Sequence, residues 1–137
     1  MQGSAGVWRR PGRPAPMVVR EDGRVELPEP PAHATPLGLR GVGGMPPTPY
    51  RVAFAPGDQV LFYTDGVTEA RDASGAFYPL AQRAALLMAR DAQHGLEELR
   101  ADLVRYAGGP PHDDVAMVLV RRSAAGPGEV QGAPAVR

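Results

Sequence analysis

The chain has 137 residues, a length that suits one domain. Its 15 basic and 15 acidic side chains give a formal net charge of zero, which argues against a nucleic-acid partner. Cysteine is absent, so disulfides and thiolate metal sites are excluded. No apolar run approaches the roughly 20 residues that span a bilayer, and the N-terminus has no hydrophobic signal region. We therefore expect a cytoplasmic protein without membrane contacts.

The first elements in chain order form a short β-hairpin. Residues 17–20 and 25–27 are mostly extended-type sequences, and the turn between them contains Asp22 and Gly23. An Asp-Gly pair supplies the backbone conformation that a tight hairpin turn needs. Residues 28–49 are rich in proline and glycine, which predicts an irregular connection.

A second pair of strands is expected after this connection. Residues 50–54 alternate in polarity, residues 55–58 form a good turn sequence, and residues 59–63 are mostly apolar. We predict that residues 50–54 and 59–63 are hairpin partners. The apolar run predicts that residues 59–63 are buried on both faces of a sheet.

Two helices and a last strand complete the expected order. Apolar residues recur at helical spacing over residues 79–93 and again over residues 95–107. Gly108 follows the second pattern and suits a helix end. The unbroken apolar run of residues 115–120 predicts a central strand, and the glycine- and proline-rich end predicts an irregular tail.

Acidic residues lie at the ends of two predicted central strands. Asp65 and Gly66 follow the strand of residues 59–63, and Asp113 and Asp114 precede the last strand. Each pair alone is typical of an ordinary turn or strand end. Acidic side chains at the ends of neighbouring strands can meet at one sheet edge, however. Such an oxygen-rich site suits Mg²⁺ or Mn²⁺.

The combination of these segments resembles the SpoIIE-like, PPM-type serine/threonine protein phosphatases. The matching segments are residues 12–19, 36–39, 55–71 and 113–120. The resemblance implies an α+β fold that is the C-terminal portion of a PPM-type α/β-β/α sandwich, with antiparallel strands, two consecutive helices and the N-terminal strands missing. It places an irregular N-terminus at residues 1–11, the partial phosphatase domain at 12–122 and a disordered tail at 123–137.

In that family, two Mn²⁺ or Mg²⁺ ions activate a water that attacks the phosphorus of a phosphoserine or phosphothreonine. The resemblance implies that Asp65 and Asp113 are metal ligands and that Gly66 and Asp114 shape the site around them. It assigns Glu69 a structural role. The implied partner is a phosphoprotein, such as an anti-sigma-factor antagonist.

The family's early acidic motifs have no counterpart in this sequence. Asp22 lies in a hairpin turn and receives no ligand role, and Arg13 stands where the family pattern has histidine. Each metal seeks about six oxygen ligands, so two aspartates could hold one ion weakly. We expect a truncated phosphatase that is weakly active or inactive. The strands left without neighbours are expected to expose apolar surface.

Two alternatives remain open at this point. One is a non-catalytic binding or regulatory module derived from the phosphatase fold. The other is an unrelated small domain, which would make the order of the two aspartate motifs a coincidence. The three histidines, His33, His94 and His112, are expected to be surface residues.

Overall fold

The computed structural model describes residues 4–7, 14–29, 41, 43, 46 and 49–123. The expectations for residues 12–13 and 36–39, for His33 and for the tail after Ser123 lie outside the described residues. The elements are β1 (Ser4–Val7), β2 (Met17–Val19), β3 (Val25–Glu26), β4 (Tyr50–Ala53), β5 (Gln59–Tyr63), α1 (Asp65–Thr68), the 3₁₀ helix η2 (Leu80–Met88), α2 (Ala92–Ala107) and β6 (Met117–Arg121).

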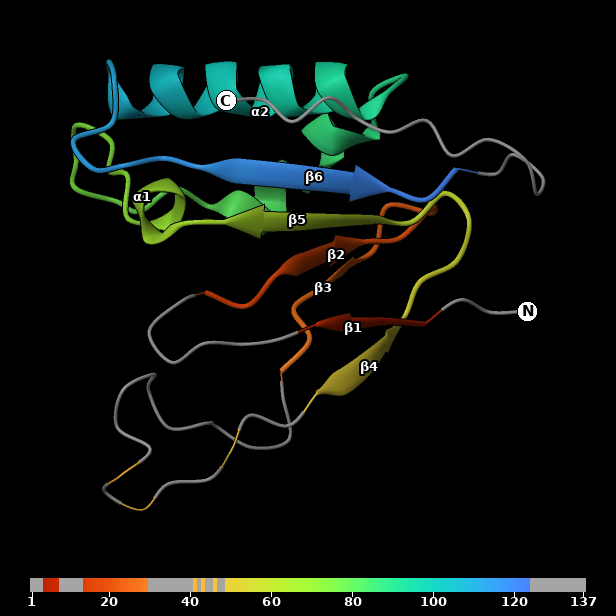
Figure 1. Cartoon of the computed structure of the whole chain (residues 1–137). Helices are drawn as coiled ribbons and strands as arrows, with labels where there is room; N and C mark the ends of the chain where they lie inside the picture. Colours follow the sequence, from red (N-terminus) through yellow and green to blue (C-terminus); the bar gives the residue numbers. More distant parts are fainter. Residues whose placement is uncertain are drawn as a thin grey trace.

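Most described strands form an antiparallel sheet in the order β3-β2-β5-β6, and β1 pairs with β4 in a separate two-stranded ribbon. Figure 1 shows α2 above the four-stranded sheet and the β1–β4 ribbon below it. The family fold expected from the sequence, an antiparallel α+β arrangement, is confirmed. β1 is a correction, because it lies within residues 1–11, where we expected no regular structure.

The predicted hairpin of residues 17–27 is confirmed. Val18 pairs with Glu26 and Val19 pairs with Val25. The turn contains Gly23 at φ 87°, and the Arg20 amide donates to the Arg24 carbonyl at 2.8 Å. A positive φ at this position explains the glycine.

The predicted pairing of residues 50–54 with 59–63 is wrong. The turn between them does form, with the Asp58 amide 3.0 Å from the Ala55 carbonyl oxygen. The buried Asp58 carboxylate also accepts hydrogen bonds from the Glu21 amide and the Arg20 guanidinium, both at 3.0 Å. These bonds anchor β5 beside the β2–β3 hairpin. The chain therefore changes sheets at this turn, which sequence spacing cannot reveal.

The two predicted helices differ in type. α2 is confirmed: the Asp91 side chain accepts from the His94 amide at its start, and Gly108 ends it at φ 74°. The segment before it is a 3₁₀ helix that ends at Met88, so the prediction of a helix over residues 79–93 was too long. The apolar spacing did not distinguish i+3 from i+4 bonding. Arg121 terminates η2 by donating to the Leu87 and Ala89 carbonyls at 3.0 and 2.8 Å.

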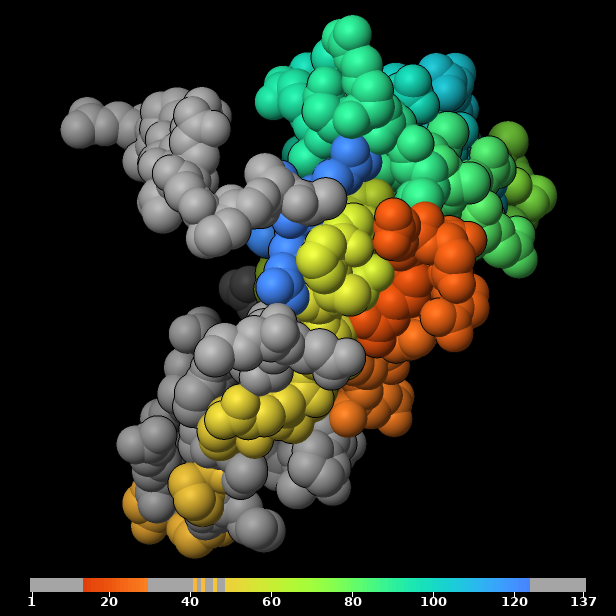
Figure 2. Space-filling model, turned by 90° about the vertical axis from the view of Figure 1, so that its right-hand side faces the viewer, coloured from red at the N-terminus to blue at the C-terminus, as the bar shows by residue number. Residues whose placement is uncertain are grey.

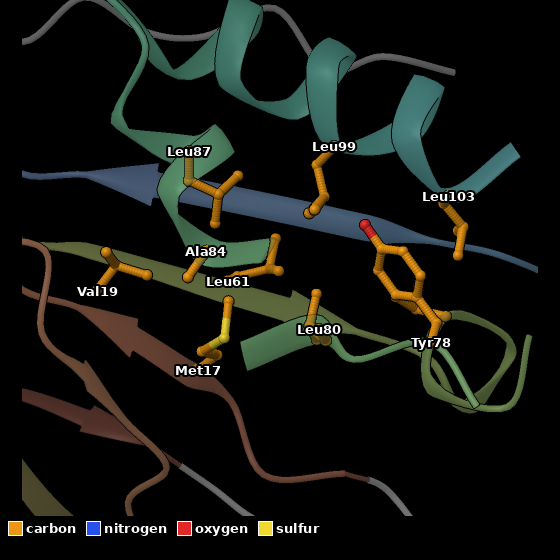
Figure 3. Packing of buried hydrophobic residues seen from close by; sticks show 10 residues of the cluster. Met17, Val19, Leu61, Tyr78, Leu80, Ala84, Leu87, Leu99 and Leu103 are labelled. Atoms are coloured by element: carbon orange, nitrogen blue, oxygen red, sulfur yellow. The ribbon is translucent and has the colours of Figure 1, made fainter. Parts of the chain in front are cut away.

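The main hydrophobic core lies between the helices and one face of the four-stranded sheet (Figure 3). Its buried residues are Met17, Val19, Leu61, Val67, Tyr78, Leu80, Ala84, Leu87, Leu99 and Leu103. On the opposite face, Val18 and Val60 pack with Val52 of β4. Figure 2 shows these layers, with helical residues in green and cyan on one side of the sheet and β4 on the other.

In the described part of the chain, some apolar side chains on that opposite face are exposed to solvent. Phe62 is 41% exposed, Val118 58% and Val120 45%. The prediction that residues 59–63 are buried on both faces is thus wrong at Phe62. β6 is the edge strand of the four-stranded sheet, where we expected a central strand. Among the described helices, none combines the length and apolar character needed to cross a membrane.

Candidate functional site

The end of β5 and the start of β6 lie side by side. The strands are antiparallel, and Tyr63 faces Met117 at the last pair of their register. The Thr64 amide extends the pairing by one step, donating to the Ala116 carbonyl at 3.1 Å. The two acidic segments predicted from the sequence therefore meet at one edge of the sheet (Figure 1).

Thr64 joins the two segments through its side chain as well. Its Oγ1 donates to the Asp114 carbonyl oxygen at 2.9 Å and accepts from the Ala116 amide at 3.0 Å. Gly66 is buried against the same loop, because a Cβ built on it would lie 2.4 Å from the Asp114 carbonyl oxygen. The hydrogen bonds of the Thr64 hydroxyl and the close packing that Gly66 permits together hold the loop of Asp113 and Asp114 against α1.

The carboxylates of this edge face solvent. Asp65, Asp113 and Asp114 are all exposed. Asp65 begins α1, and its carbonyl oxygen accepts from the Glu69 amide at 2.8 Å. The Asp113 carboxylate accepts from the Asp114 amide at 2.8 Å, which restrains that side chain. Glu69 thus contributes its backbone to the end of α1.

A cavity of about 910 Å³ adjoins the aspartate edge. It is lined by residues from three segments: Gly66, Glu69, Ala70, Arg71, Asp72, Ala73, Ser74, Arg105, Tyr106, Ala107, Gly108, Pro111, His112 and Asp113. Because Gly66 and Asp113 are among them, the cavity opens directly beside the two acidic segments. His112 is exposed in its wall.

The loop of residues 71–77 is fixed beside the cavity by aromatic contacts. The Arg71 guanidinium lies 4.4 Å from the centre of the Phe77 ring, and Tyr106 donates to the Phe77 carbonyl at 2.9 Å. Behind it, Tyr78 donates to the Asp102 carboxylate at 2.7 Å. Burial and this hydrogen bond raise the pKa of the Tyr78 hydroxyl, so it stays protonated and keeps its donor role.

These aromatic contacts and the two hydrogen bonds of the Thr64 hydroxyl were not predicted. Arg71 and Thr64 stood in the motif, but their spacing gave no information on side-chain partners. His94 caps α2 with Asp91 and lies outside the cavity lining.

The acidic edge fits part of a metal site. Carboxylate oxygens of Asp65 and Asp113 are ligands that Mg²⁺ and Mn²⁺ prefer. Within the described part of the chain, however, no group of three or more His, Cys, Asp or Glu residues is placed to hold a metal ion. The Asp114 carbonyl is engaged by Thr64. These residues can supply a share of a coordination shell and fall short of about six ligands.

Comparison with known proteins agrees with this fold. The profile of the family "Stage II sporulation protein E (SpoIIE)" matches residues 4–123. A structure of RsbU and RsbW domains from Mycobacterium tuberculosis is 28% identical with a TM-score of 0.65, covering 93% of this chain and 34% of that chain. The phosphatase domain of the cell-fate determinant SpoIIE from Bacillus subtilis, presoaked with manganese, is 16% identical with a TM-score of 0.63. That match covers 91% of this chain and 58% of the other.

The fold is thus that of a PPM-type phosphatase domain, of which this chain corresponds to a part. The chain belongs to the SpoIIE family, as the family match over residues 4–123 shows. No curated protein matches the sequence. PPM-type phosphatases are generally metal-dependent, which gives the acidic edge a chemical context.

Proposed function

We propose that this chain provides part of the catalytic centre of a SpoIIE-type serine/threonine protein phosphatase, with Asp65 and Asp113 as metal ligands. The observation that carries the proposal is the meeting of their two segments through Thr64, Gly66 and Asp114. Without this contact, each aspartate would be an ordinary exposed residue at a turn.

The residues of the edge have distinct parts in this proposal. Bound divalent ions would lower the pKa of a water and hold phosphoryl oxygens during its attack on phosphorus. Asp65 and Asp113 offer exposed carboxylates to such ions. Gly66 keeps the space beside the Asp114 carbonyl free of a side chain. The carbonyl oxygen of Asp114 accepts the hydrogen bond that the Thr64 hydroxyl donates.

The proposed substrate is a phosphoserine or phosphothreonine of another protein. The cavity beside Asp113 gives a polypeptide room to approach the edge. The RsbU and RsbW domains of the Mycobacterium tuberculosis relative support a partner of the anti-sigma-factor antagonist type. Because only two of the described carboxylates at the edge, Asp65 and Asp113, are proposed as metal ligands, we expect little or no turnover from this chain by itself.

A titration with Mn²⁺, followed by the relaxation of water protons, tests the metal ligands. Asp65→Asn and Asp113→Asn should each weaken binding by more than about tenfold, because even the outer partners of metal ligands are worth that much. Asp22→Asn is the matched control, since Asp22 lies in the β2–β3 turn with Arg24 as its partner. The proposal is wrong if the unmodified chain shows no saturable binding, or if both edge variants bind as it does.

A second candidate is a non-catalytic module that docks another protein. The exposed apolar side chains of Phe62, Val118 and Val120 favour it, as does the small number of carboxylates at the edge. Such a module would be stable and soluble, with a specific partner whose binding is unaffected by Mn²⁺. An aggregated profile in gel filtration of the isolated chain would count against it.

A further inference from the structure

The backbone leaves the sheet in an unusual way at Thr64. After the pair of Tyr63 with Met117, the Thr64 amide still donates to the Ala116 carbonyl at 3.1 Å. In an antiparallel pair the Thr64 carbonyl would accept from the Ala116 amide in return. Instead, the Thr64 carbonyl turns into α1 and accepts from the Val67 amide at 3.0 Å.

The Thr64 hydroxyl fills the place that this carbonyl has left. Oγ1 accepts from the Ala116 amide at 3.0 Å and donates to the Asp114 carbonyl at 2.9 Å. One side chain thus replaces a missing bond of the sheet and adds a bond to the acidic loop. As a result α1 begins, with Asp65, directly at the edge while β6 stays held beside it.

We propose that Thr64 is a positioning residue for the acidic edge, whose hydroxyl sets the separation of Asp65 and Asp113. Thr64 precedes Asp65 in the chain, and the carbonyl that it binds belongs to the residue after Asp113. The hydroxyl therefore links backbone positions one residue from each carboxylate. This inference rests on the proposed function, because it assigns Thr64 a role through those two ligands.

Strand pairing alone does not require the hydroxyl. The β5–β6 register is formed by five residue pairs before Thr64 is reached. Ala116 and Asp114 are exposed residues that belong to neither hydrophobic cluster, so removing the hydroxyl takes nothing from the packing of the core. Thr64→Val keeps the shape of the side chain and should fold, while it removes both hydrogen bonds. Thr64→Ser keeps the hydroxyl and is the matched control.

The test measures Mn²⁺ affinity of the full chain by water-proton relaxation for the unmodified protein, Thr64→Val, Thr64→Ser, Asp65→Asn and Asp113→Asn. Thr64→Val should weaken binding by about tenfold or more, the usual effect of removing an outer partner of a metal ligand. Thr64→Ser should restore the original affinity. A purely structural role predicts that Thr64→Val lowers stability in urea and leaves Mn²⁺ affinity unchanged.

A measurement on the unmodified chain gives an answer even if Thr64→Val fails to fold. The Ala116 amide donates a hydrogen bond to the Thr64 hydroxyl, so its hydrogen exchange reports on that contact. Binding of Mg²⁺, a diamagnetic ion, between Asp65 and Asp113 should slow this exchange. Unchanged exchange at saturating Mg²⁺, or unchanged Mn²⁺ affinity in a folded Thr64→Val variant, overturns the role of Thr64. If Asp65→Asn and Asp113→Asn also leave affinity unchanged, the proposed function itself is overturned.

Discussion

Gly66 lies directly against the carbonyl of Asp114. A Cβ added to Gly66 would be 2.4 Å from that oxygen and 3.0 Å from the carbonyl carbon. Both contacts are with backbone, so a change of side-chain rotamer cannot relieve them. The glycine is needed for a close approach of two segments 48 residues apart (114 minus 66) rather than for an unusual backbone angle.

Gly66→Ala should therefore separate α1 from the acidic loop. We expect a loss of about 1–3 kcal/mol in the free energy of unfolding, the usual cost of forcing a methyl group into filled space. The normal preference of helices for alanine over glycine, about 1 kcal/mol, acts in the opposite direction and is smaller. Urea unfolding measures the loss, and Mn²⁺ affinity should fall in the same variant.

Gly95→Ala provides a graded comparison for this variant. Its Cβ would lie 3.1 Å from Leu87 backbone atoms, a tight contact without the severe overlap at Gly66. Gly95→Ala should cost less stability than Gly66→Ala and leave Mn²⁺ affinity unchanged. Equal effects of the two substitutions on metal binding would contradict the specific role of the Gly66–Asp114 contact.

Asp58→Asn should destabilise the fold at neutral pH. Burial raises the pKa of the Asp58 carboxyl, but hydrogen bonds from the Ala55 and Glu21 amides and from Arg20 outweigh it, so the pKa is lowered on balance. The carboxylate is nearly inaccessible, and breaking a buried ion pair costs about 3–5 kcal/mol. Urea unfolding at pH 7 measures this loss.

The sign of the pKa shift sets the pH dependence of the Asp58 effect. A lowered pKa in the folded state contributes stability above the unfolded pKa of about 3.9, and this contribution is lost as pH falls through the folded value. The difference between the original protein and Asp58→Asn should therefore shrink below about pH 4. Asp22→Asn, at an exposed turn, should change stability little at either pH. A difference for Asp58→Asn that stays constant with pH would contradict the assignment.

Local signals in the sequence were sufficient for several elements. The Asp-Gly turn between β2 and β3 and the helix α2 with its stop at Gly108 could be predicted because a few neighbouring residues determine them. The partner of β4 could not be predicted. That choice depends on Asp58, whose carboxylate binds Arg20, which is 38 residues earlier in the chain.

The candidate site was predictable to a similar degree. The motif order pointed to Asp65 and Asp113 as candidates at neighbouring strand ends, and these strand ends do adjoin in the structure. The sequence could not show that the Thr64 hydroxyl would replace a backbone carbonyl in the pairing. The hydroxyl takes the place of the carbonyl only because the backbone changes direction at Thr64. No pattern of residue types encodes that change of direction.

Phosphatase activity of this chain with Mn²⁺ should be negligible on p-nitrophenyl phosphate. The described residues place too few carboxylates together to hold the two metal ions that the proposed mechanism requires. Initial rates with and without Mn²⁺ measure this, with Asp65→Ala as the control for contaminating phosphatases. Robust turnover that vanishes in Asp65→Ala would show that the chain supplies a complete centre.

The open apolar face of β5 and β6 should cause self-association. Phe62 pairs with Val118 and Val60 with Val120 in the register, so the exposed Phe62, Val118 and Val120 side chains lie on one face of neighbouring strands. An exposed apolar face that includes an edge strand favours association with another chain. Gel filtration at increasing concentrations should show a shift to larger species.

Replacing the two valines tests the source of that association. Val118→Thr with Val120→Thr keeps the β-branched shape that suits a strand while making the face polar, so the fold should persist and the concentration-dependent shift should diminish. Met88→Ser is the control, because Met88 is 42% exposed on η2, on the helical side of the sheet. If Met88→Ser reduces association as much as the double variant, general hydrophobicity is responsible. If only the double variant reduces association, the chains contact each other through the exposed face of β5 and β6 that carries Phe62, Val118 and Val120.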